Sequence, residues 1–220
     1  MTKDNQTEYY NRRASEYEQI YYRDNPPRRK EIDDEALRLK AIVRGKSLLD
    51  IACGTGYWTQ IMSQTAREII ASDLSEEMIK MARLKEYNCP VSFLQADLNA
   101  LPFDDQKFDL ISLGFWFSHH PRQKYGQLFD SLIPKLDENG QIWMIDNNPP
   151  AEGPKMESCG VDEFGNNYKR RYLDNGEEFV IVKNYFERDE LLDIFSKSFE
   201  INSIVYQKYY WSVVLTPLKR

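Results

Sequence analysis

Three aspartates, Asp50, Asp73 and Asp97, stand at the ends of short apolar segments of the sequence. Asp50 lies near the end of the first segment, Asp73 ends the second and Asp97 follows the third. If these segments are parallel strands, their carboxyl ends meet at one sheet edge, where open α/β sheets bind ligands. A carboxylate there can accept both ribose hydroxyl protons, and another can accept from an adenine amino group. The three acids together predict a site for a nucleoside-type cofactor.

A turn of small residues, running from Ala52 to Gly56, follows the first of these acids. Glycine and other small residues let the backbone pass close to a bound ligand. A dinucleotide-binding turn would carry a third glycine three residues after Gly56, and this chain has Thr59 there. The turn therefore disfavours NAD, although an NAD-dependent oxidoreductase remains an alternative. Cys53 has no partner base nearby in sequence, so we interpret it as structural.

The elements that must position these residues alternate between strand and helix patterns. Strands are expected at 47–51, 68–72, 91–95, 108–113 and 142–145, and most of these runs are nearly continuous in large apolar residues. Such runs are typical of a parallel sheet covered on both faces. Between them, Ser75 is a plausible helix N-cap, and Tyr125, Leu128, Phe129 and Leu132 form a helical stripe. The alternation predicts an α/β fold with a doubly wound, mostly parallel sheet.

The segments on either side of this core differ from it. A helix over 8–22 and a second one through Val43 are expected to form a cap over 1–45, ahead of a cofactor-binding core at 46–146. Residues 147–168 lack periodicity and predict a loop, and a hairpin over 172–183 turns at Asn175-Gly176. Loop and hairpin form a lid over 147–185, and a helix and two strands complete 186–220. We interpret 1–220 as one domain.

The composition limits the partners. A formal net charge of −6 disfavours nucleic acid and anionic membranes, and no apolar run approaches the length of a bilayer span. Three distant cysteines suit reduced thiols in a cytoplasm. No cysteine, histidine and acid cluster has zinc spacing, so no metal is expected. The basic cluster Arg28-Arg29-Lys30 is interpreted as a solvated face, and the sequence gives no oligomeric state.

The segment Leu49 to Gly56 resembles the first motif of class I S-adenosylmethionine-dependent methyltransferases. Asp73 matches the ribose-binding acid of that family and Asp97 its adenine-binding acid, while 108–113 resembles its fourth strand. The resemblance extends over 8–146. It implies a seven-stranded sheet with an antiparallel last strand, and S-adenosyl-L-methionine as cofactor. The cofactor-binding set that we infer from it is Tyr10, Asp50, Ala52, Cys53, Gly54, Gly56, Trp58, Asp73, Leu74, Met78, Ala96, Asp97, Leu98, Leu113, Gly114 and Trp116.

Some of these residues have a second interpretation. Gly114 is expected to contact the methionine amine, and Trp116 to face the sulfonium, since aromatic faces attract cations. Phe115 and Phe117 are interpreted as core. Tyr10 either closes over the cofactor or simply packs in its helix. Transfer of a methyl group to an anionic oxygen needs no base, whereas an alcohol or phenol would need one, for which His119 is the candidate. His119 could equally cap a helix or pack under the lid.

A further likeness concerns the methyl acceptor. Residues 9–17 resemble the cap helix of small bacterial O-methyltransferases, and 54–59, 170–173 and 181–183 resemble a subgroup that acts on small phosphonate metabolites. In that subgroup an arginine and a lysine of the hairpin, with a cap tyrosine, hold the anionic substrate. Arg171 and Lys183 match, and Tyr22 is a third candidate. The resemblance implies O-methylation of a small anionic molecule; the alternatives are surface charges at both positions and a non-catalytic S-adenosylmethionine-binding protein.

Overall fold

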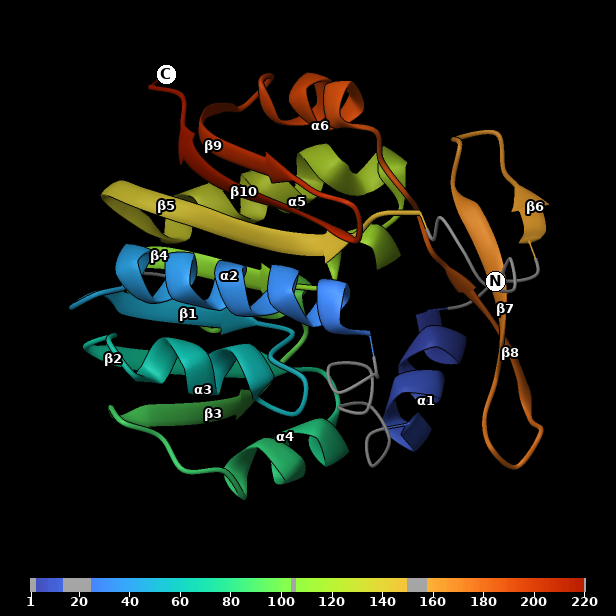
Figure 1. Cartoon of the computed structure of the whole chain (residues 1–220), viewed down its shortest axis with the longest axis horizontal. Coiled ribbons are helices and arrows are strands. Elements are labelled where there is room, and N and C mark those ends of the chain that lie inside the picture. The colour runs from blue at the N-terminus through green and yellow to red at the C-terminus, as the bar shows by residue number, and fades with distance from the viewer. Residues whose placement is uncertain (1–2, 14–24, 104–105, 150–157, 220) are drawn as a thin grey trace.

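The computed structural model describes residues 3–13, 25–103, 106–149 and 158–219. Its centre is a seven-stranded sheet in the order β3-β2-β1-β4-β5-β10-β9 (Figure 1). The strands are β1 (Ser47–Ile51), β2 (Glu68–Asp73), β3 (Val91–Gln95), β4 (Phe108–Gly114), β5 (Leu136–Asn147), β9 (Phe199–Tyr206) and β10 (Tyr210–Pro217). β1 to β5 pair in parallel, and β10 runs antiparallel to both of its neighbours. The doubly wound, mostly parallel seven-stranded sheet is confirmed.

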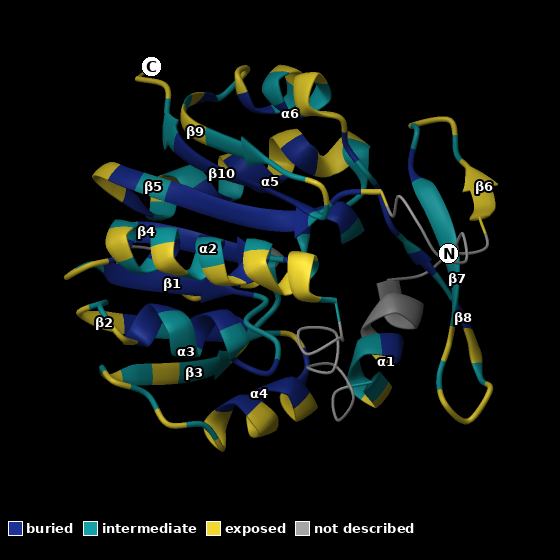
Figure 2. Ribbon diagram, in the orientation of Figure 1, coloured by how far each residue is buried: buried dark blue, intermediate teal, exposed yellow. Residues whose placement is uncertain are grey.

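The central strands β1 and β4 are buried along nearly their whole length because helices cover both faces of the sheet. Neighbouring residues of one strand point to opposite faces, so Leu48 and Leu110 pack in one core cluster while Leu49 and Ile111 pack in the other. Figure 2 shows the buried strands between the two helical layers. The sheet is therefore held from both sides, and its strand ends are fixed in place.

The helices are α1 (Lys3–Arg13), α2 (Pro26–Ile42), α3 (Tyr57–Ser63), α4 (Glu76–Arg83), α5 (Tyr125–Leu132) and α6 (Arg188–Phe195). Ser75 caps α4 as expected, since its hydroxyl accepts from the backbone N–H of Met78 at 3.2 Å. Glu76 and Glu77 lie in the first turn of α4, where the helix dipole favours negative charge. This cap sets the direction in which α4 leaves the end of β2.

The predicted N-terminal cap is only partly correct. α2 packs Ile32 and Leu39 in the same core cluster as β1, so residues 26–42 belong to the helical layer of the sheet rather than to a cap. α1 starts at Lys3, earlier than predicted, and 14–22 of the predicted helix, including Tyr22, lie outside the described residues. Tyr9 of α1 was not predicted as a core residue, yet its side chain is fully buried.

A second, three-stranded antiparallel sheet follows β5 in the chain. Its strands are β6 (Ser158–Val161), β7 (Asn167–Tyr172) and β8 (Glu178–Val182). The β7–β8 hairpin turns at 173–177 as predicted, with Gly176 at a φ of 84°. The predicted loop over 147–168 is wrong for 158–161, which pair with β7. α1 packs on β8, where Tyr9 contacts Phe179 and Ile181 (Figure 1).

Candidate functional site

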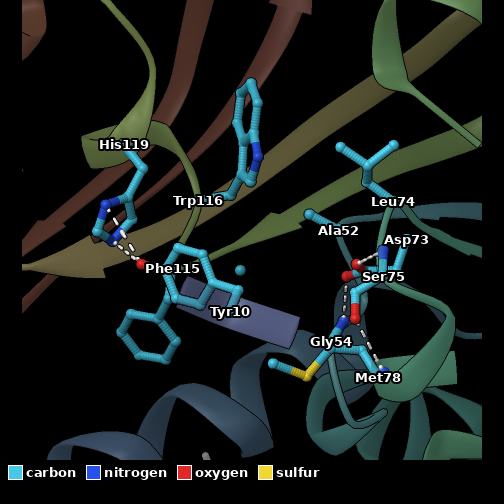
Figure 3. Close-up of a pocket in the computed structure, with 11 residues that line it drawn as sticks. Tyr10, Ala52, Gly54, Asp73, Leu74, Ser75, Met78, Phe115, Trp116 and His119 are labelled. Carbon is cyan, nitrogen blue, oxygen red and sulfur yellow. Dashed lines mark hydrogen bonds between the residues drawn. The ribbon is translucent and has the colours of Figure 1, made fainter. Parts of the chain in front are cut away.

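A cavity opens at the carboxyl ends of β1, β2 and β4 (Figure 3). It encloses about 650 Å³ when its open mouth is included. It is lined by Tyr10, Ala52, Gly54, Asp73, Leu74, Ser75, Met78, Gly114, Phe115, Trp116 and His119. Nine of these residues had been predicted from the sequence, and Ser75 and Phe115 had not been placed at a ligand. The cavity thus lies at the carboxyl ends of the strands, where open α/β sheets bind ligands.

The turn after β1 brings the backbone to this cavity in a left-handed conformation. Ala52, Gly54 and Gly56 all have positive φ, at 54°, 57° and 82°. Gly54 donates its N–H to Asp73 Oδ2 at 2.9 Å and lines the cavity. Gly56 has a different role from the predicted one: a Cβ there would come within 2.6 Å of the Tyr87 hydroxyl. It therefore allows close packing and does not line the cavity.

Asp73 presents its carboxylate at the cavity wall. Besides the bond from Gly54, its Oδ1 accepts from the N–H of Ser75 at 2.8 Å (Figure 3). Burial raises the pKa of Asp73, and these backbone N–H groups oppose that rise. The carboxylate is therefore fixed in orientation, and each oxygen keeps a lone pair for a further donor. This is the geometry expected of a group that receives two hydroxyl protons.

Asp50 lies one layer deeper. Its two oxygens accept from the hydroxyls of Thr59 at 2.6 Å and Ser112 at 2.7 Å, and burial raises its pKa to about 6. Thr59, noted in the sequence only as a missing glycine, is thus the residue that orients Asp50. Asp50 lines a narrower crevice beside the cavity, together with Ala52, Cys53, Gly54, Thr55, Tyr57, Trp58 and Gly114. Burial also raises the pKa of Cys53, so its thiol stays protonated and structural.

Trp58 closes the floor of that crevice. Its ring stacks edge-on with Trp143, with centroids 5.1 Å apart, and its Nε1 is buried with no hydrogen-bond partner among the described residues. A Cβ on Gly114 would lie 2.6 Å from Trp58 Cδ1. Gly114 is therefore required by this close approach, a reason that the sequence did not reveal.

Besides Gly56, four residues of the predicted cofactor set do not line either hollow. Leu113 is fully buried in the core between β1 and β5. Ala96 and Leu98 pack against the same core cluster, and Asp97 is half-buried beyond the end of β3. These residues were predicted from their positions near the ends of strands. Such a position places a residue at the sheet edge but does not show whether its side chain reaches the cavity.

The aromatic run after β4 divides between core and cavity. Phe117 is fully buried, as predicted, whereas Phe115 is buried but also lines the cavity, with a φ of 57°. Trp116 lines the cavity and its ring lies 4.8 Å from that of His120. The positive φ at Phe115 turns the chain at the end of β4 and brings Trp116 and His119 to the same cavity.

His119 contributes a neutral imidazole to the cavity wall. Its Nδ1 lies 2.6 Å from the carbonyl oxygen of Val182, so Nδ1 carries the proton and Nε2 accepts from the Tyr10 hydroxyl at 2.8 Å (Figure 3). Burial, reinforced by the charge of Lys183, lowers the pKa of His119 to about 3. Tyr10 therefore does lie at the cavity, and the pair joins α1 to the turn after β4.

Lys183 is not the exposed charge that one interpretation allowed. It is 4% exposed, and its Nζ donates to Asp146 Oδ1 at 3.0 Å and to Ser118 Oγ at 2.6 Å. Burial lowers the pKa of Lys183, while the attraction of Lys183 holds the pKa of Asp146 below its usual value despite burial. Arg171, on β7, is half-buried. Asp146 and Ser118 were missed because they come from β5 and from the turn after β4.

The described residues contain neither a metal-binding cluster nor a membrane-spanning helix. Among them, no group of three or more histidine, cysteine or acidic side chains is placed to hold a metal ion. Likewise, none of their helices combines the length and apolar character of a membrane span.

Comparisons with known proteins agree on one family. Residues 48–140 match the model of a methyltransferase domain family. The demethylmenaquinone methyltransferase of Lactococcus lactis is 31% identical over 113 residues, 49% of this chain and 44% of that protein. The one from Shouchella clausii is 30% identical over 125 residues, 53% of this chain and 52% of that protein. The chain thus spans about half the length of the curated relatives it matches.

The similarity to solved structures extends over nearly the whole chain. The structure named "DhpI-SAH complex structure" is 27% identical, with a TM-score of 0.79 over 99% of this chain and 97% of that chain. The structure named "DhpI-SAM-HEP complex" is 26% identical, with a TM-score of 0.78 over 97% of each chain. Both cover the sheet and the hairpin together.

Proposed function

We propose that this chain, which belongs to the class I S-adenosylmethionine-dependent methyltransferases, transfers the methyl group of that cofactor to an oxygen of a small anionic molecule. The observation that carries the proposal is the Asp73 carboxylate, fixed by two backbone N–H groups beside a left-handed glycine turn. Thr59 stands where a dinucleotide-binding turn would carry its third glycine, and its hydroxyl donates to Asp50.

The residues present fit S-adenosylmethionine. Asp73 would receive the ribose hydroxyls, and the crevice beside it offers an acceptor, Asp50, and the unpartnered N–H of Trp58. These two groups have the complementary chemistry for an amino acid tail, which carries an ammonium and a carboxylate. Gly114 lines both hollows, and a Cβ there would collide with Trp58. When bound, the cofactor supplies an electrophilic methyl group on a sulfonium.

The protein contributes position and exclusion of water. Methyl transfer is an in-line displacement with a neutral leaving group, so orientation and desolvation supply much of the rate. Trp116 lines the cavity with an aromatic face, which attracts a sulfonium. Tyr10 of α1 covers the cavity and is tied to His119. The site thus orients two reactants under a helix that limits access of water.

An anionic acceptor fits the proton state of His119. The imidazole is neutral, its pKa is lowered by burial, and its Nε2 is already engaged by Tyr10. Such a group can accept one hydrogen bond but is a weak base. An oxygen that is already ionised needs no base, and the positive charges of Lys183 and Arg171 both act on His119 of the cavity wall. Cytoplasmic location remains an expectation from the cysteines.

Two measurements test the proposal. Calorimetry with S-adenosylmethionine and NAD should show binding of the first alone; NAD binding without S-adenosylmethionine binding would refute it. A screen of carboxylates, phosphonates and phenols with methyl-labelled cofactor should then show transfer to an acid. Transfer to neutral phenols with no transfer to any acid would contradict the anionic acceptor, and binding with no transfer to any compound would favour a non-catalytic role.

A further inference from the structure

Arg28, in the first turn of α2, reaches the edge of the sheet and does not point into solvent. Its Nε donates to the Tyr210 hydroxyl at 2.5 Å, its Nη2 donates to Asn147 Oδ1 at 3.1 Å, and its guanidinium lies 5.1 Å from the Tyr210 ring centre. Its neighbours Arg29 and Lys30 are exposed. The expectation that the whole cluster is a solvated face is therefore wrong for Arg28.

A chain of short contacts joins Arg28 to Lys183. The amide of Asn147 accepts from Arg28 through Oδ1 and donates through Nδ2 to Asp146 Oδ1 at 3.2 Å. The same Asp146 oxygen accepts from Lys183 Nζ at 3.0 Å. Two cations from distant parts of the chain, α2 and the end of β8, thus approach one point at the carboxyl end of β5.

Arg171 adds a third positive charge to this region. On β7 it pairs with Phe179, and Ile181 follows on β8 two residues later, so these side chains share one face of the hairpin; Lys183 comes directly after β8. In the part of the chain that the structure describes, neither a hydrogen bond nor an ion pair engages the Arg171 side chain. Burial lowers the pKa of Lys183 and raises that of Tyr185, and the charges of Arg171 and Arg28 act to lower both.

The charges here do not balance. Arg28 bonds only to neutral groups among the described residues, and Asp146 is the single acid that acts on Lys183. Three positive groups against one carboxylate leave a local excess of two (3 − 1), in a chain whose net charge is −6. Like charges so placed repel one another at a cost in free energy, which a bound dianion would offset.

We propose that Arg28 binds the methyl acceptor, and that the acceptor group is a small dianion such as a phosphonate, a phosphate monoester or a dicarboxylate. The inference rests on the proposed function and specifies its substrate class. Arg28 uses two of its five donors on Tyr210 and Asn147, which leaves donors for an oxyanion. In the reaction an acceptor oxygen forms the bond to the methyl carbon as the carbon–sulfur bond breaks, and the bonding pair goes to sulfur. The product keeps one negative charge, and no proton moves.

The test uses pairs of probe anions that match in shape and differ by one charge. The full chain, loaded with S-adenosylhomocysteine, is titrated by calorimetry with methylphosphonate and methanesulfonate, at a pH at which methylphosphonate is doubly ionised. Malonate and its monoamide, malonamate, form a second, planar pair. We expect one or both dianions to bind about tenfold or more tightly than their monoanionic partners. A preference seen only in the methylphosphonate pair indicates a tetrahedral acceptor group. A preference seen only in the malonate pair indicates a planar one.

Two variants then assign the preference. Arg28→Met should reduce the dianion preference by about tenfold, whereas Arg29→Met, which removes an exposed charge one residue away, should leave it unchanged. Circular dichroism and S-adenosylhomocysteine affinity report whether Arg28→Met is folded. If it is not, Arg28→Gln, which also removes the charge but keeps a polar side chain beside Tyr210 and Asn147, replaces it.

Three results would overturn the inference. Equal binding of dianions and monoanions by the wild-type chain refutes the charge count without any variant. A folded Arg28→Met chain, or a folded Arg28→Gln chain in its place, with an unchanged preference refutes the assignment to Arg28. Failure to bind S-adenosylhomocysteine at all refutes the proposed function and this inference with it, whereas binding of that ligand without anion discrimination refutes the inference alone.

Discussion

The buried pair of Lys183 and Asp146 makes the most demanding prediction. The side chains are 5% and 0% exposed, and their charged atoms lie 3.0 Å apart. Replacing Lys183 with Met leaves a buried carboxylate without its counter-charge. Breaking a buried pair in this way costs about 3–5 kcal/mol, much more than a surface pair is worth. We therefore expect Lys183→Met to lower the unfolding free energy by about 3–5 kcal/mol at neutral pH.

A double variant separates lost charge pairing from lost packing. Asp146 also accepts from the N–H groups of Ser118 and Asn147, at 2.9 and 2.8 Å, so Asn at 146 keeps one acceptor while removing the charge. Lys183→Met with Asp146→Asn should therefore be more stable than Lys183→Met alone. Urea denaturation, followed by circular dichroism, gives the unfolding free energies of the wild-type chain, of Lys183→Met, of Asp146→Asn and of the double variant. The double-mutant cycle then yields the coupling.

A small effect would refute this reasoning. If Lys183→Met lost less than about 0.5 kcal/mol, as surface substitutions usually do, the lysine would not be buried against Asp146. The expected instability also changes how activity data are interpreted. Loss of turnover in a Lys183 variant could reflect unfolding, whereas Arg171, half-buried and outside any ion pair of the described chain, allows acceptor binding to be tested separately.

Three further predictions concern the cavity. Asp73→Ala should weaken S-adenosylmethionine binding by about 1.5–3 kcal/mol in calorimetry while the melting temperature is kept, and unchanged affinity would contradict the ribose assignment. Burial lowers the pKa of His119 to about 3 in the folded chain, so between about pH 6.5 and pH 3 only the unfolded chain binds a proton at this residue. The unfolding free energy should therefore fall as the pH is lowered from about 6.5 toward about 3, and it should fall less steeply in His119→Asn. Equal slopes in the two chains would contradict the lowered pKa. Gly114→Ala should cost about 1–3 kcal/mol of stability against Trp58, and Gly114→Ala with Trp58→Leu should recover part of it; no loss would refute the close approach.

The parts of the fold with a local signal were predicted well from the sequence. β1 and β3 were predicted at the same bounds that the structure shows, 47–51 and 91–95, because each is a short segment rich in apolar residues between turn residues. The cap at Ser75 needs only a hydroxyl before a helix, and Asp73 needs only a strand end. These features depend on a few consecutive residues, so a single sequence contains them.

What the sequence could not supply depends on contacts between distant residues. Thr59 appeared as a missing glycine until its hydroxyl was found on Asp50. Arg28 appeared as one of three surface charges until Tyr210, far along the chain, was found beside it. β6 has an exposed, weakly patterned sequence and exists through pairing with β7. In each case tertiary packing, not propensity, decides the outcome.

The division between local and distant signals also follows the division between cofactor and acceptor. The matched methyltransferase segment, 48–140, contains Asp50, Asp73 and the glycine turn. Arg28, Arg171 and Lys183 all lie outside it. A match over this segment therefore concerns the proposed cofactor site and says little about the acceptor. The proposed acceptor is inferred instead from charges that α2, β5 and the hairpin bring together, and their excess of two positive charges favours a dianion over a neutral molecule.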